Sequence, residues 1–295
     1  MKTRKHSASL GLLAAAVIGM GALAAASPAK ADQIDVTLRK PGQVAPHFVT
    51  DPTFGQGICD QNNIATAQCT YGTESFKNLT QAQATNGFST NFTTGANHVL
   101  PSQSLTGTYS GQLTRVPTNE YGGAQGSAAY PTALGVSVYT LNLASKGVPG
   151  LNYLGVWITA MDQSNVLRIH TASGGEFDFT TSTLRSYIDQ TANPSAYFGN
   201  PTASFLGQDS GEPFAYVNFF DTTGYFTSVD FTNSGNSGFE SSNHAVGYFN
   251  PLVVTGQDLG TTTVNGIPEP ASLALLGAGL VAILAASRRP SDIAA

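Results

Sequence analysis

Short runs in which apolar and polar residues alternate recur through the central part of the chain. In 175–182, Phe177 and Phe179 alternate with Glu176 and Asp178. A period of two places alternate side chains on opposite faces of a β-strand, so one face of this run is apolar. Similar strand-like runs cover 134–143, 151–162, 165–171, 213–221 and 224–233. The pattern predicts strands that pack over a shared core.

Polar turn residues separate two pairs of these runs. The sequence DQSN lies between the runs 151–162 and 165–171, and Thr222-Thr223 lies between 213–221 and 224–233. Turn residues between strand-like runs are typical of β-hairpins. We therefore expect each pair to form a hairpin.

One segment, 182–194, has helical rather than strand periodicity. Ser182 precedes its apolar residues as a candidate N-cap, and Pro194 prevents the helix from continuing. Several short strands around one short helix predict an all-β fold, a jelly-roll-like two-sheet β-sandwich, over residues 71–255.

An apolar run near the N-terminus follows the basic residues Lys2, Arg4 and Lys5. Ala29 and Ala31 then form the A-x-A pattern of signal-peptidase cleavage, so residues 1–31 are predicted to be a secretory signal peptide and Asp32 the first mature residue. An uncleaved anchor is the alternative by length. The Ala and Gly content of the run and the cleavage pattern favour removal.

Residues 32–70 have weaker periodicity and are expected to wrap the edge of the sandwich. Cys59 and Cys69 lie in a polar, loop-like part of this segment. In an exported chain such a pair predicts a disulfide, worth about 2–3 kcal/mol of stability. A metal-binding or catalytic thiol pair is disfavoured, because the spacing is not CxxC and no His lies between the two cysteines.

A second apolar run, Ala271–Ser287, lies near the C-terminus and carries no charge. Its length is at the short limit for a membrane-spanning helix. Arg288 and Arg289 follow directly, as cytoplasmic stop-transfer residues do, and a buried core helix is disfavoured because the run lacks a polar face. We predict a C-terminal transmembrane helix, with 256–267 as a linker before it and 290–295 as a cytoplasmic tail.

Pro268, Glu269 and Pro270 lie immediately before this run. Two prolines hold the chain extended, so the triplet is expected to be stiff and accessible to a protease. The stretch PEPASLALLGAGLVAILAA, followed shortly by RR, closely resembles the PEP-CTERM sorting signal of Gram-negative bacteria.

This resemblance implies how the protein is processed and sorted. In this family an exosortase, an integral-membrane cysteine protease-transpeptidase, recognises the Pro-Glu-Pro element, removes the tail and releases or transfers the protein. By resemblance, Pro268, Glu269 and Pro270 are the recognition residues, and the membrane and the exosortase are transient partners. The product is expected at the cell surface or outside the cell, associated with exopolysaccharide or a biofilm matrix.

The central domain also resembles β-sandwich domains that commonly precede this signal. The likeness rests on YGTESF at 71–76 and on 211–247, where GFESSN approximates a G-F-E-x-D-N pattern with Ser242 in place of the acidic residue. It implies a fold rather than a ligand.

Charge narrows the classes of partner. Residues 32–267 contain 7 basic and 16 acidic residues, a net charge of −9. No basic patch is available to neutralise phosphates, so nucleic acid is not expected as a partner.

No local motif indicates catalysis, and we predict that the protein is not an enzyme. The histidines of the predicted mature chain lack a metalloprotease signature; His170 in a strand and His244 in a polar loop are predicted to be structural. A secreted glycoside hydrolase is the weaker alternative, because it needs two carboxyl groups about 5–10 Å apart in a cleft. Candidates are Glu176, Asp178, Glu212 and Asp221.

Glu74, Glu240 and Asn243 supply oxygen ligands near the two ends of the domain. They are candidates for a structural Ca²⁺ site, with turn capping or solvent exposure as the alternative.

Tyr197 and Phe198 are the candidates for stacking on sugar rings, because AYFGNP at 196–201 is predicted to be an exposed aromatic loop. A carbohydrate-binding module of lectin-like jelly-roll type is therefore one hypothesis. A structural or matrix-associated surface protein needs only the features of the two ends, and it is the leading hypothesis. Further aromatic candidates are Tyr121, Trp157, Tyr187 and Tyr225.

Overall fold

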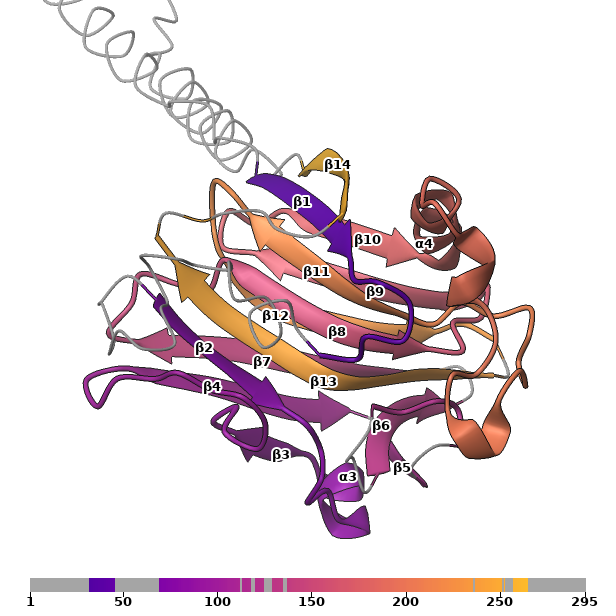
Figure 1. Ribbon diagram of the computed structural model, residues 1–295. Helices are drawn as coiled ribbons and strands as arrows, with labels where there is room; N and C mark the ends of the chain where they lie inside the picture. The colour runs from indigo at the N-terminus through magenta and orange to yellow at the C-terminus, as the bar shows by residue number, and fades with distance from the viewer. Residues whose placement is uncertain are drawn as a thin grey trace, which may run out of the picture. The chain divides into compact units, whose positions relative to one another are not determined.

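Two antiparallel β-sheets lie face to face in the computed structural model (Figure 1). The predicted two-sheet β-sandwich is thus confirmed. All described residues belong to one unit, Ala31–Gly266. The structure describes residues 32–45, 69–111, 113–117, 120–124, 129–134, 137–235, 237–250, 252 and 257–264.

Within the described residues the larger sheet has eight strands, seven of which follow one path. The path ends in β14 on one side and in β5 on the other, and an eighth strand, β2 (Cys69–Glu74), pairs with β13. The order is β14 (Gln257–Val264), β1 (Asp32–Leu38), β11 (Ala215–Asp221), β8 (Tyr153–Thr159), β13 (Gly238–Phe249), β6 (Ala129–Leu134) and β5 (Thr114–Pro117).

The smaller sheet has six strands in the described part of the chain. Short helices lie in the connections between strands: α3 (Gln81–Asn86), α4 (Thr181–Ile188) and the 3₁₀ turns η1 (Pro194–Tyr197) and η2 (Ala203–Phe205). The strand order is β10 (Glu176–Thr180), β9 (Asn165–Thr171), β12 (Phe226–Asn233), β7 (Ser137–Lys146), β4 (Ser104–Gly111) and β3 (Phe88–Thr90).

The main core lies between the two sheets and draws side chains from both. Phe177 and Phe179 of β10 are buried in it, whereas Glu176 and Asp178 are exposed, as the alternation in this run predicted. The outer face of the larger sheet is partly covered as well. There Trp157 is fully buried and its Nε1 donates to the carbonyl oxygen of Gly122 at 2.8 Å. This cover explains why β8 and β11 are buried along their whole length.

Both predicted hairpins are wrong. β8 and β11 belong to the larger sheet, while β9 and β12, which follow them in the chain, belong to the smaller sheet. The DQSN turn and the Thr222-Thr223 turn therefore carry the chain from one sheet to the other. β8 pairs with β11 and β13 instead, and β9 pairs with β10 and β12. Turn chemistry marks a reversal of the chain, but it does not fix which strand becomes the partner.

The predicted helix is present but shorter and differently capped. α4 covers Thr181–Ile188, and its N-cap is Thr180, whose side chain accepts a hydrogen bond from the backbone N–H of Thr183. Ser182, the predicted cap, lies inside the helix, because the last residue of β10 already has the extended backbone that a cap requires. Its apolar residues at helical spacing are buried: Leu184, Tyr187 and Ile188.

Two segments near the ends of the domain also differ from prediction. Asp32–Leu38 does not wrap the edge; as β1 it lies inside the larger sheet between β11 and β14. Gln257–Val264, predicted as linker, is the edge strand β14. In β1, residues Ile34, Val36 and Leu38 are buried, which gives this short strand an apolar face like that of the others.

No helix among the described residues is long and apolar enough to cross a membrane. The predicted signal peptide, residues 1–31, and the predicted C-terminal helix, Ala271–Ser287, lie outside the described residues. Cys59 lies outside them too, whereas Cys69 is fully buried at the start of β2. The Cys59–Cys69 disulfide therefore stays a prediction.

Candidate functional site

The first and last strand residues of the described sandwich lie side by side. Ala29 and Ala31 on one side, and Pro268, Glu269, Pro270, Arg288 and Arg289 on the other, lie outside the described residues. β1 begins at Asp32, and β14 ends at Val264. These two residues are paired across the antiparallel ladder of β1 and β14. The described chain thus begins and ends at neighbouring positions of the larger sheet.

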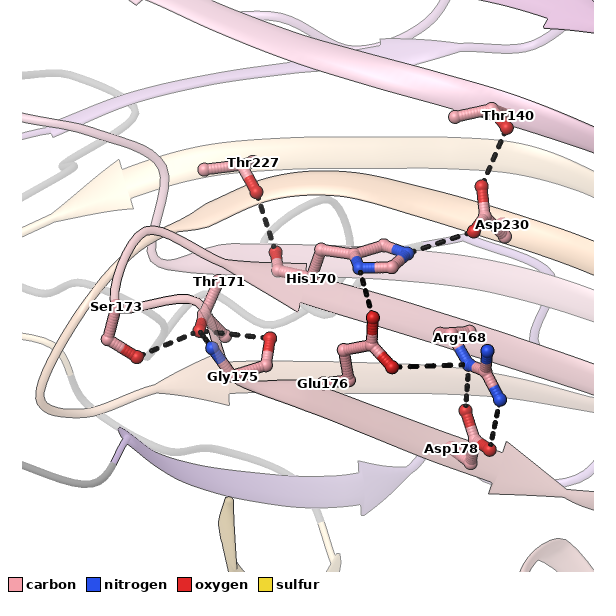
Figure 2. A network of polar contacts seen from close by, with 10 residues as sticks. All are labelled: Thr140, Arg168, His170, Thr171, Ser173, Gly175, Glu176, Asp178, Thr227 and Asp230. Atoms are coloured by element: carbon pink, nitrogen blue, oxygen red, sulfur yellow. Dashed lines mark hydrogen bonds and ion pairs between the residues drawn. The ribbon is translucent and has the colours of Figure 1, made fainter. Parts of the chain in front are cut away.

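A charged network covers part of the outer face of the smaller sheet (Figure 2). His170 of β9 lies between two carboxylates: its Nε2 is 2.9 Å from Asp230 Oδ2, and its Nδ1 is 3.4 Å from Glu176 Oε1. Beside it, Arg168 donates to Asp178 through Nε at 2.6 Å and Nη2 at 2.8 Å. This bidentate contact holds the pKa of Asp178 below its usual value.

The charged network has few features of a catalytic site. Glu176 and Asp178, two of the hydrolase candidates, are about half exposed and each faces a basic side chain. Exposed ion pairs of this kind contribute about 0–1 kcal/mol each. The network fits a solvated polar surface better than a cleft that excludes water from a substrate.

A cavity of about 450 Å³ lies where two loops meet helix α4. The loop after β8 contributes Asp162, and the loop before β11 contributes Glu212. Arg185 of α4 lines the same cavity, and its guanidinium group lies 5.2 Å from the centre of the Phe198 ring. The other lining residues are Met161, Gln163, Ser164 and Gly211.

Glu212 is the titratable group of this cavity whose ionisation is altered most clearly. Its partial burial raises the pKa to about 7, and the negative charges of Asp162 and Asp209 add to the effect. A hydrogen bond with Asp162 raises it further, whereas Arg185 acts in the opposite direction. A carboxyl group that is partly protonated at neutral pH both donates and accepts hydrogen bonds.

The four predicted hydrolase carboxylates are not brought together. Glu176 and Asp178 lie on the outer face of the smaller sheet, Glu212 lines the cavity, and Asp221 is buried at the end of β11. The sequence alone does not identify Asp162 as a partner of Glu212, because the two are far apart in the chain and Asp162 lies in a predicted turn. Arg185 was missed for the same reason.

The predicted Ca²⁺ ligands are also not assembled into one site. Glu74 faces His244 in the register of β2 and β13, which places Glu240 four residues away, roughly 13 Å along the strand. Asn243 Nδ2 donates to the carbonyl oxygen of Val44 at 2.7 Å. Among the described residues, no group of three or more His, Cys, Asp or Glu side chains is placed to share a metal ion. This separation argues against one calcium site shared by all three residues.

Glu74 is satisfied by donors of its own surroundings. Its Oε1 accepts from the backbone N–H of Phe76 and from the Thr94 hydroxyl, both at 2.7 Å, and its Oε2 accepts from the Thr90 hydroxyl at 2.5 Å. The residue is 4% exposed. Its side chain thus joins β2 to the end of β3 and to the segment that follows it.

The 196–201 segment is not an exposed aromatic loop. Tyr197 is 3% exposed, and its hydroxyl donates to the carbonyl oxygen of Arg39 at 2.8 Å. It is therefore not available to stack on a sugar in this structure. Phe198 is partly buried against the core and beneath Arg185. Trp157, the only Trp, is fully buried.

His244 is a core residue rather than part of a polar loop. It lies in β13, is fully buried, and its Nε2 is 2.9 Å from Ser241 Oγ while its Nδ1 is 2.9 Å from the Tyr109 hydroxyl. Its ring stacks on Phe231 with centroids 4.8 Å apart. Burial lowers the pKa of His244 to about 3. Although Ser and His are adjacent here, both are fully buried, so a substrate has no access to them.

Comparison with known proteins finds one family. The model of the PEP-CTERM protein-sorting motif matches residues 266–289. The matched segment contains Pro268, Glu269 and Pro270, the apolar run and both arginines. No curated protein and no solved structure matches the chain. The resemblance to this sorting signal is therefore confirmed, and it covers the C-terminal segment only.

Proposed function

We propose that this chain, which carries a PEP-CTERM sorting motif, is an exported structural protein that an exosortase processes and that remains associated with an extracellular polysaccharide matrix. The observation that carries the proposal is the motif match at 266–289. That motif implies processing by an exosortase and delivery to the cell surface or the extracellular space. Association with the matrix and transient anchoring in the inner membrane are the finer parts of the proposal.

The fold supports processing at both ends. β1 starts at Asp32, directly after the predicted signal peptide, and β14 ends at Val264, two residues before the matched motif. Cleavage after Ala31 and cleavage within or near Pro268–Pro270 would each leave the strands of the sandwich whole. A domain bounded in this way keeps its core after both cuts.

The experiment compares the protein from membranes and from culture medium by intact-mass spectrometry. The wild-type product outside the cell is expected to begin at Asp32 and to lack the apolar tail. A chain with Pro268→Ala and Pro270→Ala is expected to stay in the membrane fraction with the tail attached. Pro290→Ala, beyond the arginine pair, is the matched control and should be processed normally. Normal tail removal in the double variant would refute recognition of the Pro-Glu-Pro element.

Saccharide binding at the cavity is a second candidate function. Asp162 and Glu212 supply acceptors, and Arg185 supplies donors, within a space of about 450 Å³. Alternating donors and acceptors suit hydroxyl groups, and ligand pockets typically measure about 300–1,000 Å³. In this proposal a saccharide binds in the cavity rather than by stacking on Tyr197.

Retention on a column of the producer's exopolysaccharide tests this second function. Glu212→Gln is expected to reduce retention, while Glu176→Gln, an exposed acid on the other surface, should leave it unchanged. Equal retention of both variants and the wild type would locate any binding elsewhere.

We also propose that the domain has no hydrolase activity. The support is the separation of the candidate carboxylates and the burial of Ser241 and His244. Release of reducing sugar from the same exopolysaccharide, abolished by Glu212→Gln, would overturn this view.

A further inference from the structure

Two buried carboxyl groups meet at the end of the sandwich where β1 begins. Asp32 is 3% exposed and Asp221 is 1% exposed. Asp221 is paired with Ile34 across β1 and β11, and Asp32 precedes Ile34 by two residues, so both acids lie on the inward face. A Cβ atom added to Gly224 would lie 2.4 Å from Asp32 Oδ1 and 3.0 Å from Asp221 Oδ2. The two oxygens thus converge on one small volume.

The hydrogen-bond donors around the two acids do not reach Asp221 Oδ2. Asp221 Oδ1 accepts from the backbone N–H groups of Thr223 at 3.1 Å and Gly224 at 2.6 Å. Asp32 Oδ2 accepts from the hydroxyl of Ser173, in the turn between β9 and β10. Asp221 Oδ2 is buried and has no hydrogen-bond partner. A buried carboxylate oxygen without a partner destabilises the fold unless it binds a proton or a cation.

No cationic side chain in the described part of the chain forms an ion pair with either acid. The segments that pack against them, 171–175, 222–225 and 261–264, contain no Asp, Glu, Lys, Arg or His. Burial raises the pKa of Asp221, the two backbone N–H groups lower it, and the charge of Asp32 raises it. Within the described residues, no positive side chain therefore compensates the two acids.

Removal of the signal peptide creates such a charge at this position. Hydrolysis of the peptide bond between Ala31 and Asp32 adds water, leaving a carboxylate on Ala31 and an α-ammonium group on Asp32. That nitrogen is three covalent bonds from the side-chain carboxyl carbon of Asp32. At neutral pH an α-amino group is largely protonated, since its ordinary pKa is about 7.7–8.0.

We propose that Asp32 and Asp221 form a binding site for the new α-ammonium group of the mature chain, so that signal-peptide cleavage itself stabilises the folded domain. This inference rests on the proposed export and on cleavage after Ala31. Before cleavage, the nitrogen of Asp32 is an uncharged amide and the two acids repel each other. After cleavage, the ammonium group neutralises them at the edge of the sheet.

The test uses the exported protein with two different N-termini. One product is the wild type; the other comes from a gene with Gly-Ser inserted between Ala31 and Asp32, which moves the ammonium group two residues away. Thermal unfolding is measured from pH 6 to pH 10. We expect the wild type to be more stable at pH 6, with an unfolding constant about tenfold smaller, equivalent to one pKa unit in the α-amino group.

The pH dependence has a definite sign. Pairing raises the pKa of the ammonium group in the folded state, so the added stability is complete below pH 7 and is lost as pH rises through the folded pKa. The two chains should therefore unfold at the same temperature near pH 10. Asp221→Asn should remove the difference at every pH, because the amide keeps an acceptor for Thr223 and Gly224 and ends the repulsion. Asp189→Asn, an exposed acid after α4, is the matched control and should preserve the difference.

The cleavage position, the stability at pH 6 and the effect of Ca²⁺ each distinguish the ammonium site from an alternative. Mass spectrometry of the two products reports the cleavage position, so an N-terminus other than Asp32 would contradict the proposed processing and not the ammonium site. With Asp32 confirmed, equal stability of the two chains at pH 6 would overturn the site. If millimolar Ca²⁺ raises both melting temperatures equally and Asp221→Asn abolishes that rise, the pair binds a divalent cation and the ammonium proposal is wrong.

Discussion

Asp32 and Val264 are cross-strand neighbours, although 231 residues separate them in the sequence. The first residue of the predicted mature chain therefore lies beside the last strand residue before the sorting motif. The edge of the larger sheet is where both ends of the exported domain are fixed.

Removal of the tail is expected to leave stability unchanged, whereas loss of β14 is not. A chain that ends at Gly266 keeps every strand of the sheet, but one that ends at Thr255 exposes the edge of β1. Loss of this hydrogen-bonded ladder should lower the free energy of unfolding by about 3 kcal/mol or more. Chemical denaturation of both chains measures the difference, and equal stabilities would show that β14 contributes nothing.

His244 is expected to make the fold sensitive to acid. The pKa of His244 is about 3 in the folded state. In the unfolded chain its imidazole binds a proton near pH 6.5, whereas in the folded chain it stays neutral until the pH is close to 3. Stability should therefore fall as pH decreases from 6.5 toward 3, by a total on the order of 4 kcal/mol. Denaturant titrations at successive pH values should show a shallower decline for His244→Gln. Equal slopes for His244→Gln and the wild type would argue against the lowered pKa of His244.

Glu212 should have the opposite effect on the pH dependence of stability, favouring the folded state at low pH. Its pKa of about 7 means that the folded state retains a proton which the unfolded chain loses near pH 4.5. Its stabilising effect is complete below pH 4.5 and is lost as pH rises through 7; after solvent screening it amounts to about 1 kcal/mol. Glu212→Gln should raise the melting temperature at pH 8 and leave it nearly unchanged at pH 4. An increase of the same size at both pH values would argue against the raised pKa.

Gly155 should not tolerate a side chain. A Cβ atom there would lie 2.4 Å from the Tyr153 hydroxyl oxygen and 2.5 Å from that of Tyr216. Those hydroxyls already donate to Asn218 and to the carbonyl oxygen of Asn243. Gly155→Ala is therefore expected to cost about 1–3 kcal/mol by overpacking. Gly211→Ala, which meets no atom within 4 Å, provides the comparison in the same unfolding assay.

The disulfide prediction is directly measurable. The non-reduced mature protein should be lighter by two hydrogens than the reduced form and should not react with a thiol-alkylating reagent after unfolding. Cys59→Ser should lower stability by about 2–3 kcal/mol, because the unfolded chain regains the freedom of the loop. Labelling of both cysteines in the untreated protein would show that they are reduced.

Local periodicity predicted the strands well and their partners poorly. Phe177 and Phe179 could be placed in the core because a strand has only two faces. The partner of β8 could not be predicted, because the turn after it looks the same whether the next strand joins the same sheet or crosses to the other. Thr180 was missed as a cap for a related reason: it is at once the last strand residue and the first capping residue.

The candidate site could not be predicted where it depends on contacts between residues that are distant in the sequence. Asp162 and Glu212 meet only because the loops after β8 and before β11 lie together. Glu74 and Glu240 were expected to meet, but the register of β2 with β13 opposes Glu74 to His244 instead. The sorting motif is the exception, because Pro268, Glu269 and Pro270 act as a continuous segment and need no fold to bring them together.

The position of β1 also sets an order of events during synthesis. Among the described strands, β1 pairs with β11 and β14, and both lie roughly 180 residues or more further along the chain. Contacts of such long range close slowly, since a large loop must be ordered first. The N-terminal strand therefore stays unpaired until nearly the whole domain has been made, so the larger sheet is completed only after its C-terminal strands have been synthesised.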